Sequence, residues 1–464
     1  MAYTNFCCRS GGNNLNAGTR KGDTTEPGTA PSFAYNGTFA TDTFTVTSGA
    51  QGGSTTNPQA DGVVAGDFVH VSNGAVGRIA RVASVTTTTI VLDTTATVGS
   101  GTGATLANVG GAWAGPSGAT GFPIGTLTNA VTNTSGNNVR INLKNNQTYS
   151  ISAFLSSNQA AVSVQGYSSS YGDFGKATID ASTNAISLYS QTGAGTLLAD
   201  AILQNNGASG INAGIAVTAG ALTRVVVNTV RGAGISVTGT VRIEECETYA
   251  CNSANSASSG GVLVSGSGIA RISRCTIHDN VGSNSNGLVL TGAGPVFVKN
   301  TIFDSNENDG VLITATSVAT FEDCDFYNNG RDGIESTATQ AQLYSENSNF
   351  IKNGRYGAEQ AASTVRNWFI VNAGYGAGTA ANASGTTSGA NIQETGAVTY
   401  ASNVTPWVDP ANGDFRINLA AAKGAGRGTF TETAASYTGT VGYPDIGAAQ
   451  HIDPASGGSF AWVG

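Results

Sequence analysis

Between residues 201 and 376, short apolar runs alternate with asparagine and glycine in a pattern that repeats about every 24 residues. A single unit of this size cannot bury its own apolar face, whereas stacked units can, so a fixed period indicates a solenoid. Each clear copy is followed by a glycine that opens a further triplet, at Gly287, Gly310, Gly333 and Gly357. The first residues of the four clear copies are 25, 24 and 24 positions apart: Cys275–Asn280, Asn300–Asn306, Cys324–Asn329 and Ser348–Asn353.

The repeated runs are too short and too rich in Val, Ile, Thr and Phe for helices, so they predict β-strands. Asparagine tolerates the left-handed backbone region, so an asparagine at each corner would let the chain turn sharply. Leucine-rich repeats need a helical half and propeller blades are longer, which leaves a parallel β-helix. We expect stacked asparagines to mark one corner, at Asn206, Asn280, Asn306, Asn329 and Asn353.

With these repeats the sequence resembles the right-handed parallel β-helix, or pectin-lyase-like, superfamily of phage and bacterial type. The resemblance covers residues 140–385. It implies an all-β fold, a right-handed parallel β-helix solenoid of about eight to ten coils. It indicates less about function, because one fold hosts many unrelated sites.

Flanking segments divide the rest of the chain. Residues 1–37 are rich in Gly, Asn and Thr and predict an irregular arm. Residues 38–109 contain short strands with glycine turns, which predict a small antiparallel barrel or sandwich inserted where the solenoid begins. The resemblance implies a cap at residues 110–139, with a short helix at Thr126–Val131. It also implies a C-terminal cap at residues 386–464, because open coil ends expose unpaired strand edges.

Two motifs carry the prediction of the C-terminal cap. Asp409–Arg416 and Val441–Ala448 resemble the closing segments of bacterial and phage β-helix proteins, and they follow the coils in the expected order. Loop chemistry alone, with proline and glycine placed for turns, is the other interpretation.

Charge and hydropathy narrow the possible settings. The formal net charge is −8 and charged residues make up 11% of the chain, without the clustered Lys and Arg of a nucleic-acid footprint. No window holds 18 apolar residues, so we expect no membrane insertion. The N-terminus lacks the apolar stretch of a secretory signal. Because β-solenoids of this composition are typical of extracellular surfaces, we expect a virion component released by lysis, located on the virion surface.

The six cysteines do not indicate a metal site. Cys246 and Cys275 occupy equivalent places in adjacent coils, where they are either free apolar filler or a disulfide. Cys324 lies two coils further on, about 10 Å away and out of reach. Cys7 and Cys8 form too bare a pair to bind a metal. No zinc spacing is present, so we expect no metal and no cofactor.

Candidate chemistry is sparse. The resemblance implies, for lyases, an acidic calcium cluster with a basic proton abstractor, and for glycoside hydrolases a Gly-His-Gly and an Asp-Asp pair. Neither hydrolase motif occurs, and His70, His278 and His451 are solitary. The best carboxylate pair is Glu335 and Glu359, the second residues of their triplets. They would lie about 5 Å apart on adjacent coils, which suits a retaining glycosidase, or they form a solvated acidic stripe.

The same register gives two predictions about surfaces. The positions that precede Glu335 are Leu263, Val289 and Leu312, an apolar ladder expected to point outward unless the register slips. An exposed apolar ladder marks a contact surface, and phage β-helix spikes commonly trimerise, so the resemblance implies a homotrimer. Tyrosines near the turns are expected to be exposed and to stack on sugar rings: Tyr327, Tyr356 and Tyr375.

The sequence therefore favours a non-enzymatic virion surface protein, a phage tail spike, tail fibre or capsid-surface fibre with a role in attachment or host-glycan binding. Its expected partners are itself, other virion proteins and host-surface polysaccharide. A polysaccharide-degrading enzyme, a glycoside hydrolase or lyase on the same scaffold, is the alternative, supported by fold analogy and by Glu335 and Glu359. A secreted adhesin is a weaker third class.

Overall fold

The computed structural model describes the backbone of Thr4–Cys8, most of residues 34–426 and residues 446–448. The chain forms two compact units, Met1–Ala208 with Ala219–Val225, and Ser209–Thr218 with Val226–Gly464. Within residues 34–426 the description is interrupted at residues 52–54, 66–67, 73–76, 93–100, 109–138, 146–147, 152–153, 158–161, 169–172, 183, 208–210, 257–258, 362–367, 377–383, 386–391, 401–403 and 424.

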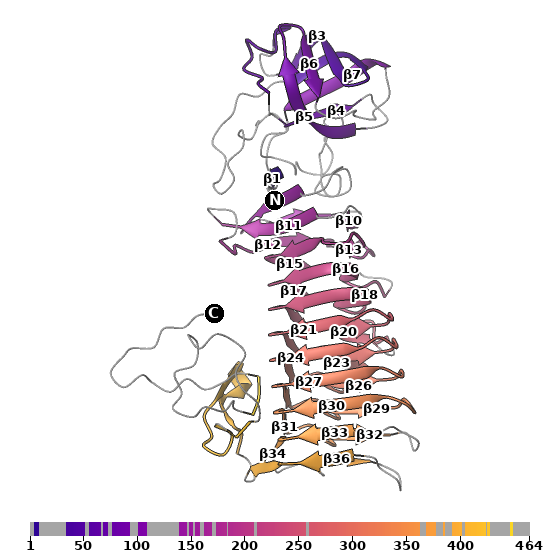
Figure 1. The fold of residues 1–464 in the computed structure, drawn as a ribbon, viewed down its shortest axis with the longest axis vertical. Coiled ribbons are helices and arrows are strands. Elements are labelled where there is room, and N and C mark those ends of the chain that lie inside the picture. Colours follow the sequence, from indigo (N-terminus) through magenta and orange to yellow (C-terminus); the bar gives the residue numbers. More distant parts are fainter. Residues whose placement is uncertain are drawn as a thin grey trace, which may run out of the picture. The chain divides into compact units, whose positions relative to one another are not determined.

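The first unit contains a closed six-stranded antiparallel barrel with strand order β2-β3-β6-β5-β4-β7 (Figure 1). Tyr35, Phe39, Phe44 and Leu106 fill its interior. The predicted small β module is therefore a barrel, and it begins inside the segment predicted as an irregular arm. Its strands are β2 (Ala34–Ala40), β3 (Thr43–Gln51), β4 (Phe68–Ser72), β5 (Gly77–Val85), β6 (Thr89–Leu92) and β7 (Gly101–Asn108).

The arm also contributes a strand to the solenoid. β1 (Thr4–Cys8) pairs in parallel with β8 (Val139–Lys144), so the barrel is an insertion between two neighbouring strands. The predicted cap lies almost wholly in residues 109–138, outside the described residues. The first unit continues with β9 (Thr148–Ser150), β10 (Leu155–Ser157), β11 (Val162–Tyr167), β12 (Ala177–Asp180), β13 (Tyr189–Gln191), β14 (Leu197–Ala199), β15 (Ala201–Gln204) and part of β16 (Ile215–Thr223).

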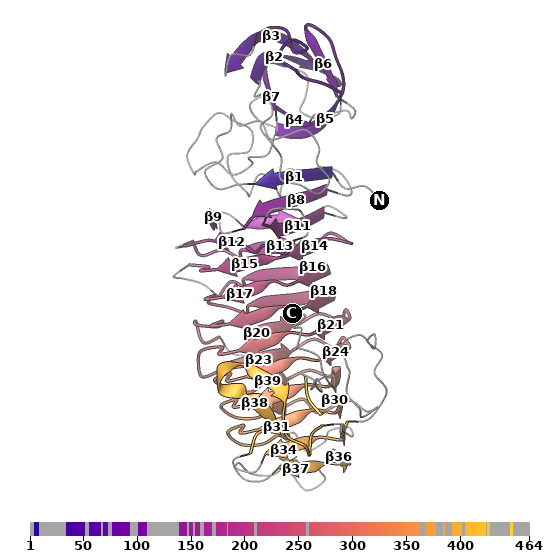
Figure 2. The ribbon, with the colours of Figure 1, turned by 90° about the vertical axis from the view of Figure 1, so that its left-hand side faces the viewer.

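Coils of the second unit contribute three strands each, and like strands stack in parallel (Figures 1 and 2). We call the three ladders faces 1, 2 and 3; β18 (Ile235–Glu244) runs through faces 2 and 3. In this unit face 1 has β17 (Val226–Asn228), β19 (Glu247–Tyr249), β22 (Thr276–His278), β25 (Ile302–Asp304), β28 (Asp325–Tyr327), β31 (Asn349–Ile351), β34 (Gly374–Gly376) and β37 (Val398–Tyr400).

Faces 2 and 3 complete the coils. Face 2 has β20 (Ser259–Val264), β23 (Ser285–Leu290), β26 (Val311–Ile313), β29 (Ile334–Ser336), β32 (Ala358–Gln360) and β35 (Ser384–Gly385). Face 3 has β21 (Ala270–Ser273), β24 (Val296–Lys299), β27 (Val318–Glu322), β30 (Gln342–Glu346), β33 (Trp368–Val371) and β36 (Ile392–Thr395).

The predicted parallel β-solenoid is confirmed. Face 1 is an 11-stranded parallel sheet, and every strand of it except β37 lies between residues 140 and 385, which agrees with the eight to ten coils predicted. Because β36 and β37 continue the same ladders, the coils extend past residue 385 to residue 400. None of the described residues forms a helix long and apolar enough to cross a membrane.

Like residues stack on like in the core, because neighbouring coils are in register. Phe303, Phe326, Phe350 and Tyr375 form a column on face 1, with successive ring centroids 5.0, 4.8 and 5.5 Å apart. These spacings match the distance between paired strands, so each ring packs flat on the next.

The asparagine corner is confirmed for four residues. The side-chain amide of Asn280 donates to Asn306 Oδ1 at 2.7 Å, that of Asn306 to Asn329 at 2.9 Å, and that of Asn329 to Asn353 at 2.9 Å. Asn206 is also buried at the end of a face 1 strand. Val230 and Cys251 follow the two intervening strands, so Asn206 is separated from this asparagine ladder.

The reason given for the corner asparagines needs a correction. The left-handed backbone belongs to the residue before each ladder asparagine, at Asp279, Ser305, Asn328 and Lys352, with φ between 46° and 55°. A second left-handed residue precedes each face 1 strand, at Arg274, Asn300, Asp323 and Asn347. The ladder asparagines are therefore selected for their amides and not for tolerance of positive φ.

The C-terminal segment packs along the side of the solenoid. β38 (Trp407–Asp409) and β39 (Asp414–Ile417) form an antiparallel hairpin around a short 3-10 turn, Pro410–Asn412. Trp407 and Phe415 pack on Tyr327 of face 1, and Figures 1 and 2 both show the hairpin beside this face. The apolar side chains of this part of the C-terminal segment therefore cover the outside of face 1.

Four of the cysteines are buried thiols that form no disulfide, namely Cys246, Cys251, Cys275 and Cys324. Glu247 pairs in register with Thr276, which places Cys246 and Cys275 in adjacent coils as predicted. Burial raises the pKa of the Cys275 thiol well above its usual value. These cysteines therefore act as small apolar filler.

Candidate functional site

Glu335 and Glu359 stack in adjacent coils, as the sequence predicted. Glu335 of β29 pairs in register with Glu359 of β32. The register continues through Leu312, Val289 and Leu263. We call these five residues the outer row of face 2.

The outer row is more buried than the sequence suggested. Val289 is fully buried, and Leu263 and Leu312 are half-buried. Glu335 and Glu359 are 5% and 1% exposed. The expectations of an exposed apolar ladder and of solvated carboxylates are therefore wrong. Members of the row lie about 4.8 Å apart and shield one another, and charged side chains from the preceding turns contact the two glutamates.

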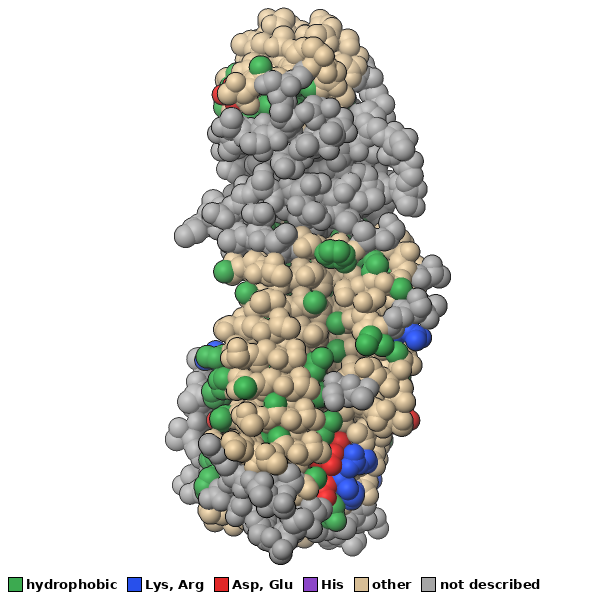
Figure 3. Space-filling model, turned by 90° about the vertical axis from the view of Figure 1, so that its right-hand side faces the viewer, with side chains coloured by type: hydrophobic (Ala, Val, Ile, Leu, Met, Phe, Trp, Pro, Cys, Tyr) green, Lys and Arg blue, Asp and Glu red, His purple; other side chains and the backbone are tan. Residues whose placement is uncertain are grey.

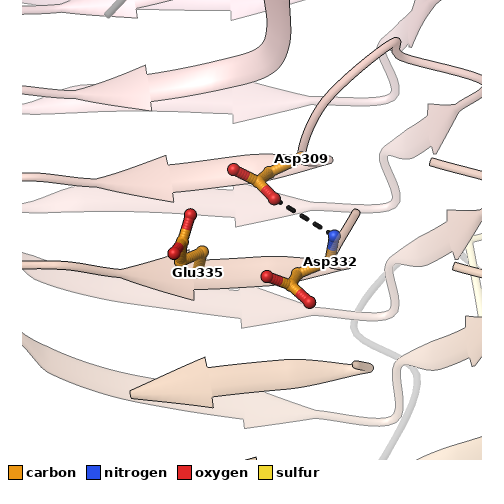
Figure 4. A group of neighbouring side chains, drawn as sticks. All are labelled: Asp309, Asp332 and Glu335. Atoms are coloured by element: carbon orange, nitrogen blue, oxygen red, sulfur yellow. Dashed lines mark hydrogen bonds between the residues drawn. The ribbon is translucent and has the colours of Figure 1, made fainter. Parts of the chain in front are cut away.

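Two aspartates from those turns join Glu335. Asp309 and Asp332 are fully buried and lie just before β26 and β29. Figure 4 shows the carboxyl groups of Asp309, Asp332 and Glu335 converging from adjacent coils. Each of the three offers an oxygen within 4.8 Å of the others. The sequence analysis overlooked both aspartates, although each directly precedes a repeat glycine.

Two arginines contact these carboxylates. Arg355 donates to Asp332 at 3.2 and 2.5 Å, and it also pairs with Glu335 and Glu359. Arg331 donates to Glu335 Oε1 at 3.0 Å. Each glutamate therefore has an aligned arginine beside it. The missed signal was a repeated Arg-x-Gly-x-Glu, which places each arginine four residues before its glutamate.

Burial and mutual repulsion shift the pKa values of several groups in the cluster. Burial, followed by repulsion from Glu335, raises the pKa of Asp309 to about 8. Burial and the charge of Asp332 raise the pKa of Glu359 to about 7. The hydrogen bond to Asp332, together with the surrounding carboxylates, raises the pKa of Arg355 above its usual value. Four carboxyl groups against two guanidinium groups therefore favour retention of a proton within the cluster at neutral pH.

The aspartates also have a structural role. Asp309 Oδ1 accepts the backbone N–H of Asp332, and Asp332 Oδ1 accepts that of Tyr356, at 3.1 and 2.9 Å. One coil earlier, Asn286 Oδ1 accepts the N–H of Asp309. This second side-chain ladder satisfies backbone donors that the turns leave without strand partners.

Two chemical uses of the cluster can be considered. Carboxylate oxygens are ligands for hard divalent cations, but the guanidinium groups of Arg331 and Arg355 already neutralise the same oxygens. Glycan cleavage would need a carboxyl group that reaches the sugar. The arginines are 41% and 39% exposed while Glu359 is 1% exposed, so a ligand meets guanidinium first. Figure 3 shows acidic and basic side chains meeting in one patch on this side of the second unit.

The predicted glycan-binding tyrosines are mostly inaccessible. Tyr327 is 6% exposed beneath the hairpin, and Tyr375 is 1% exposed at the end of the aromatic column. Their expected exposure is therefore wrong. Tyr356 is half-buried, with the Arg355 guanidinium 5.3 Å from its ring centroid.

An exposed aromatic row lies on face 3 and was missed by the sequence analysis. Phe297, Tyr344 and Phe369 are 42%, 37% and 42% exposed. They share one register, in which Phe297 pairs with Thr320, Thr320 with Tyr344 and Tyr344 with Phe369. We call these four residues the face 3 row. The asparagine and glycine repeats lie on the other two strands of each coil, so they do not align the residues of this strand.

Residues 213–405 match the family model described as a right handed beta helix region. No curated protein matches the chain. Together with the observed ladders, this match supports a right-handed parallel β-helix over residues 213–405, as the sequence predicted.

Solved structures with a similar fold include pectate lyase Pel9A, at 12% identity over 69% of this chain and 90% of that chain, with a TM-score of 0.45. The GH87 alpha-1,3-glucanase catalytic unit from Streptomyces thermodiastaticus strain HF3-3 is 12% identical over 82% and 88%, with a TM-score of 0.35. The tailspike protein gp49 from Pseudomonas phage LKA1 is 11% identical over 81% and 64%, with a TM-score of 0.28. These values are too low to indicate a shared activity.

Proposed function

We propose that this chain is a non-enzymatic glycan-binding protein that serves on a virion surface, as a tail spike, tail fibre or capsid-surface fibre, in attachment to host polysaccharide. The face 3 row carries the binding part of the proposal. Removing water from an exposed aromatic ring costs little free energy, and such a ring can stack on the apolar face of a sugar ring. Three of them share one register on a regular sheet, with Thr320 between Phe297 and Tyr344.

The surroundings of the carboxylate cluster support binding over cleavage. A glycosidase needs one carboxyl group to donate a proton to the glycosidic oxygen and another to act as nucleophile or base. Here Glu335 and Glu359 pair with arginines, and the two aspartates accept backbone hydrogen bonds. Each carboxyl group therefore has a structural partner.

One observation favours the alternative of glycan cleavage. The pKa of Glu359 is raised to about 7, a value suited to a general acid at neutral pH. Movement of Arg355 away from the cluster would expose this carboxyl group. The alternative therefore predicts cleavage that depends on Glu359 and Glu335.

The two functions can be separated in one experiment. The full chain is incubated with a panel of bacterial and algal polysaccharides, and both retention in affinity gels and release of reducing ends are measured. The proposal predicts retention without release. Release that is lost in both Glu335→Gln and Glu359→Gln would replace it with the hydrolase or lyase. Absence of retention on every polymer would also reject it.

Self-association and contacts with other virion proteins belong to the same proposal. The homotrimer was inferred from Leu263, Val289 and Leu312, and Val289 is now found buried within its own chain. A trimer would therefore have to use other surfaces. The mass of the chain in solution measures its oligomeric state, and a monomer at micromolar concentration would remove this part of the proposal.

A further inference from the structure

Building on the proposed glycan binding, we infer that the ligand is an uncharged polysaccharide that lies along the stacking direction of the coils, across the outside of face 3.

Polar side chains lie at both ends of the face 3 row, in line with its aromatic rings. Arg271 pairs in register with Phe297, and its guanidinium lies 5.6 Å from the ring centroid. At the other end Phe369 pairs with the exposed Gln393. Aromatic rings that bind sugar faces are therefore continued at both ends by side chains that donate hydrogen bonds to hydroxyl groups.

The spacing suits a chain that crosses the strands. Paired strands lie about 4.8 Å apart, so Phe297 and Phe369, three coils apart, span about 14 Å. One coil step is comparable with the length of one pyranose unit in an extended polysaccharide. A chain laid along the solenoid therefore meets equivalent positions at each unit. A chain laid along a strand would meet only one ring.

A second outward row of face 3 argues against a polyanion. Lys299, Glu322 and Glu346 are in register beside the face 3 row. Lys299 and Glu322 lie 3.7 Å apart and are 38% and 44% exposed. Tyr344 donates to Glu346 Oε2 at 2.8 Å. Glu322 and Glu346 repel an acidic polymer, as does the net charge of −8, and the two cations Lys299 and Arg271 lie only at the Phe297 end of the row. Carboxylates also accept hydrogen bonds from neutral sugar hydroxyls.

The same charges disfavour a second copy of the chain as the occupant of this face. Cores of protein interfaces are depleted in charged residues, because burial of an imperfectly paired charge is costly. A protein partner would have to bury Lys299, Glu322 and Glu346 to cover the aromatic rings. A polysaccharide can contact the rings and leave these charges hydrated.

The test compares uncharged and anionic polymers on the full chain. The uncharged probes are β-1,4-glucan, β-1,3-glucan, mannan and dextran, each also as oligosaccharides of increasing length. The anionic probes are alginate and polygalacturonate. Binding is measured by affinity gel electrophoresis and by calorimetry. The variants are Phe297→Ala, Phe369→Ala and Tyr344→Ala, with Phe174→Ala as a matched control because Phe174 is exposed in the other unit.

We expect binding to at least one uncharged polymer, weakened about fivefold to tenfold by Phe297→Ala and by Phe369→Ala. Tyr344→Ala also removes a ring of the row and should weaken binding as well, whereas Phe174→Ala should have no effect. Affinity should rise with oligosaccharide length until the ligand covers about 14 Å and then level off. Circular dichroism and urea midpoints verify that each variant is folded.

Three outcomes would overturn the inference. Preference for the anionic polymers would reject the uncharged ligand, and affinity unchanged by Phe297→Ala and Phe369→Ala would reject this face; either leaves the proposed glycan binding intact. Failure to bind any polymer would remove the proposed function and the inference together.

Discussion

At the scale of single residues, side-chain amides and carboxylates take over hydrogen bonds that the backbone cannot make at the corners. Asn329 Oδ1 accepts both the side-chain amide and the backbone N–H of Asn306, and its own amide donates to Asn353 and to the Phe303 carbonyl. One buried side chain therefore satisfies groups in three successive coils. Loss of such a residue leaves several buried groups without partners.

Asn329→Ala should lower the free energy of unfolding by about 1–3 kcal/mol, because buried donors and acceptors on both neighbouring coils would lose their hydrogen-bond partners. The control is Asn284→Ala, at an exposed position outside the asparagine ladder. Urea unfolding followed by circular dichroism measures both variants. Equal midpoints for the two would show that the asparagine ladder contributes little.

Arg355→Ala should also destabilise the chain, because Asp332 and Glu359 would lose their cationic partner while remaining buried. We expect a loss of about 1–3 kcal/mol, less than for a fully buried pair, since the guanidinium is partly in water. Arg416→Ala, which removes a surface pair with Asp414, serves as control and should leave the urea midpoint unchanged. A neutral effect of Arg355→Ala would mean that the carboxyl groups take up protons without cost.

At the scale of elements, the sequence predicted the contacts between equivalent residues of successive coils. It did not predict the contacts of the C-terminal hairpin. The period places Asn306 on Asn329 and Glu335 on Glu359, because stacking converts sequence spacing directly into contact. Arg331 and Arg355 also recur with the period, but their contacts with the glutamates depend on the path of a turn, which the period alone does not specify. The docking of Trp407 on Tyr327 brings together residues 80 positions apart outside the repeat, so no periodic signal exists for it.

The hairpin should contribute substantially to stability through Trp407, which is 3% exposed and packs on Tyr327 and Phe415. Trp407→Ala should cost about 3–5 kcal/mol of local packing and expose the hairpin to protease. Val408→Ala, on the exposed side of the same strand, is the control. Limited proteolysis with mass analysis of the fragments provides the measurement. Unchanged cleavage kinetics in Trp407→Ala would contradict the predicted docking energy.

A second C-terminal contact makes stability depend on pH. Asp325 accepts hydrogen bonds from Asn349 and from the Ala448 backbone N–H, at 2.8 and 3.0 Å. Burial raises its pKa from 3.8 to about 7. The folded state therefore holds a proton that the unfolded state releases, so this contribution to stability is greatest below about pH 4 and is lost as the pH rises through about 7.

We therefore expect the urea midpoint to fall between about pH 4 and pH 7, and the fall to be smaller in Asp325→Asn. Asp409→Asn, at an exposed carboxylate, should keep the full dependence. A midpoint that rises with pH in the unsubstituted chain would show that carboxylates with lowered pKa values dominate instead.

At the scale of the whole molecule, the coils behave as interchangeable units because each corner presents the same groups upward and downward. Deletion of residues 280–305 would join Asp279 to Asn306. Asp279 would then replace Ser305, another left-handed residue, with φ of 46° in place of 51°. We expect this variant to fold with a modestly lower thermal midpoint, since stability in such arrays is close to a sum over repeats.

Deletion of only residues 280–292 is the contrasting variant. It breaks the register and should abolish cooperative unfolding, because apolar and polar positions would exchange faces. Calorimetry of the two deletions distinguishes them. If the whole-coil deletion also failed to fold, the coils would not be equivalent units.

The asparagine ladder thus has a consequence for how such a gene can change. Because each ladder residue accepts from one neighbour and donates to the next in the same way, an exchange between misaligned copies of a coil yields a chain whose corners still match. Protein length can then vary in whole-coil increments, while insertions of any other size are selected against.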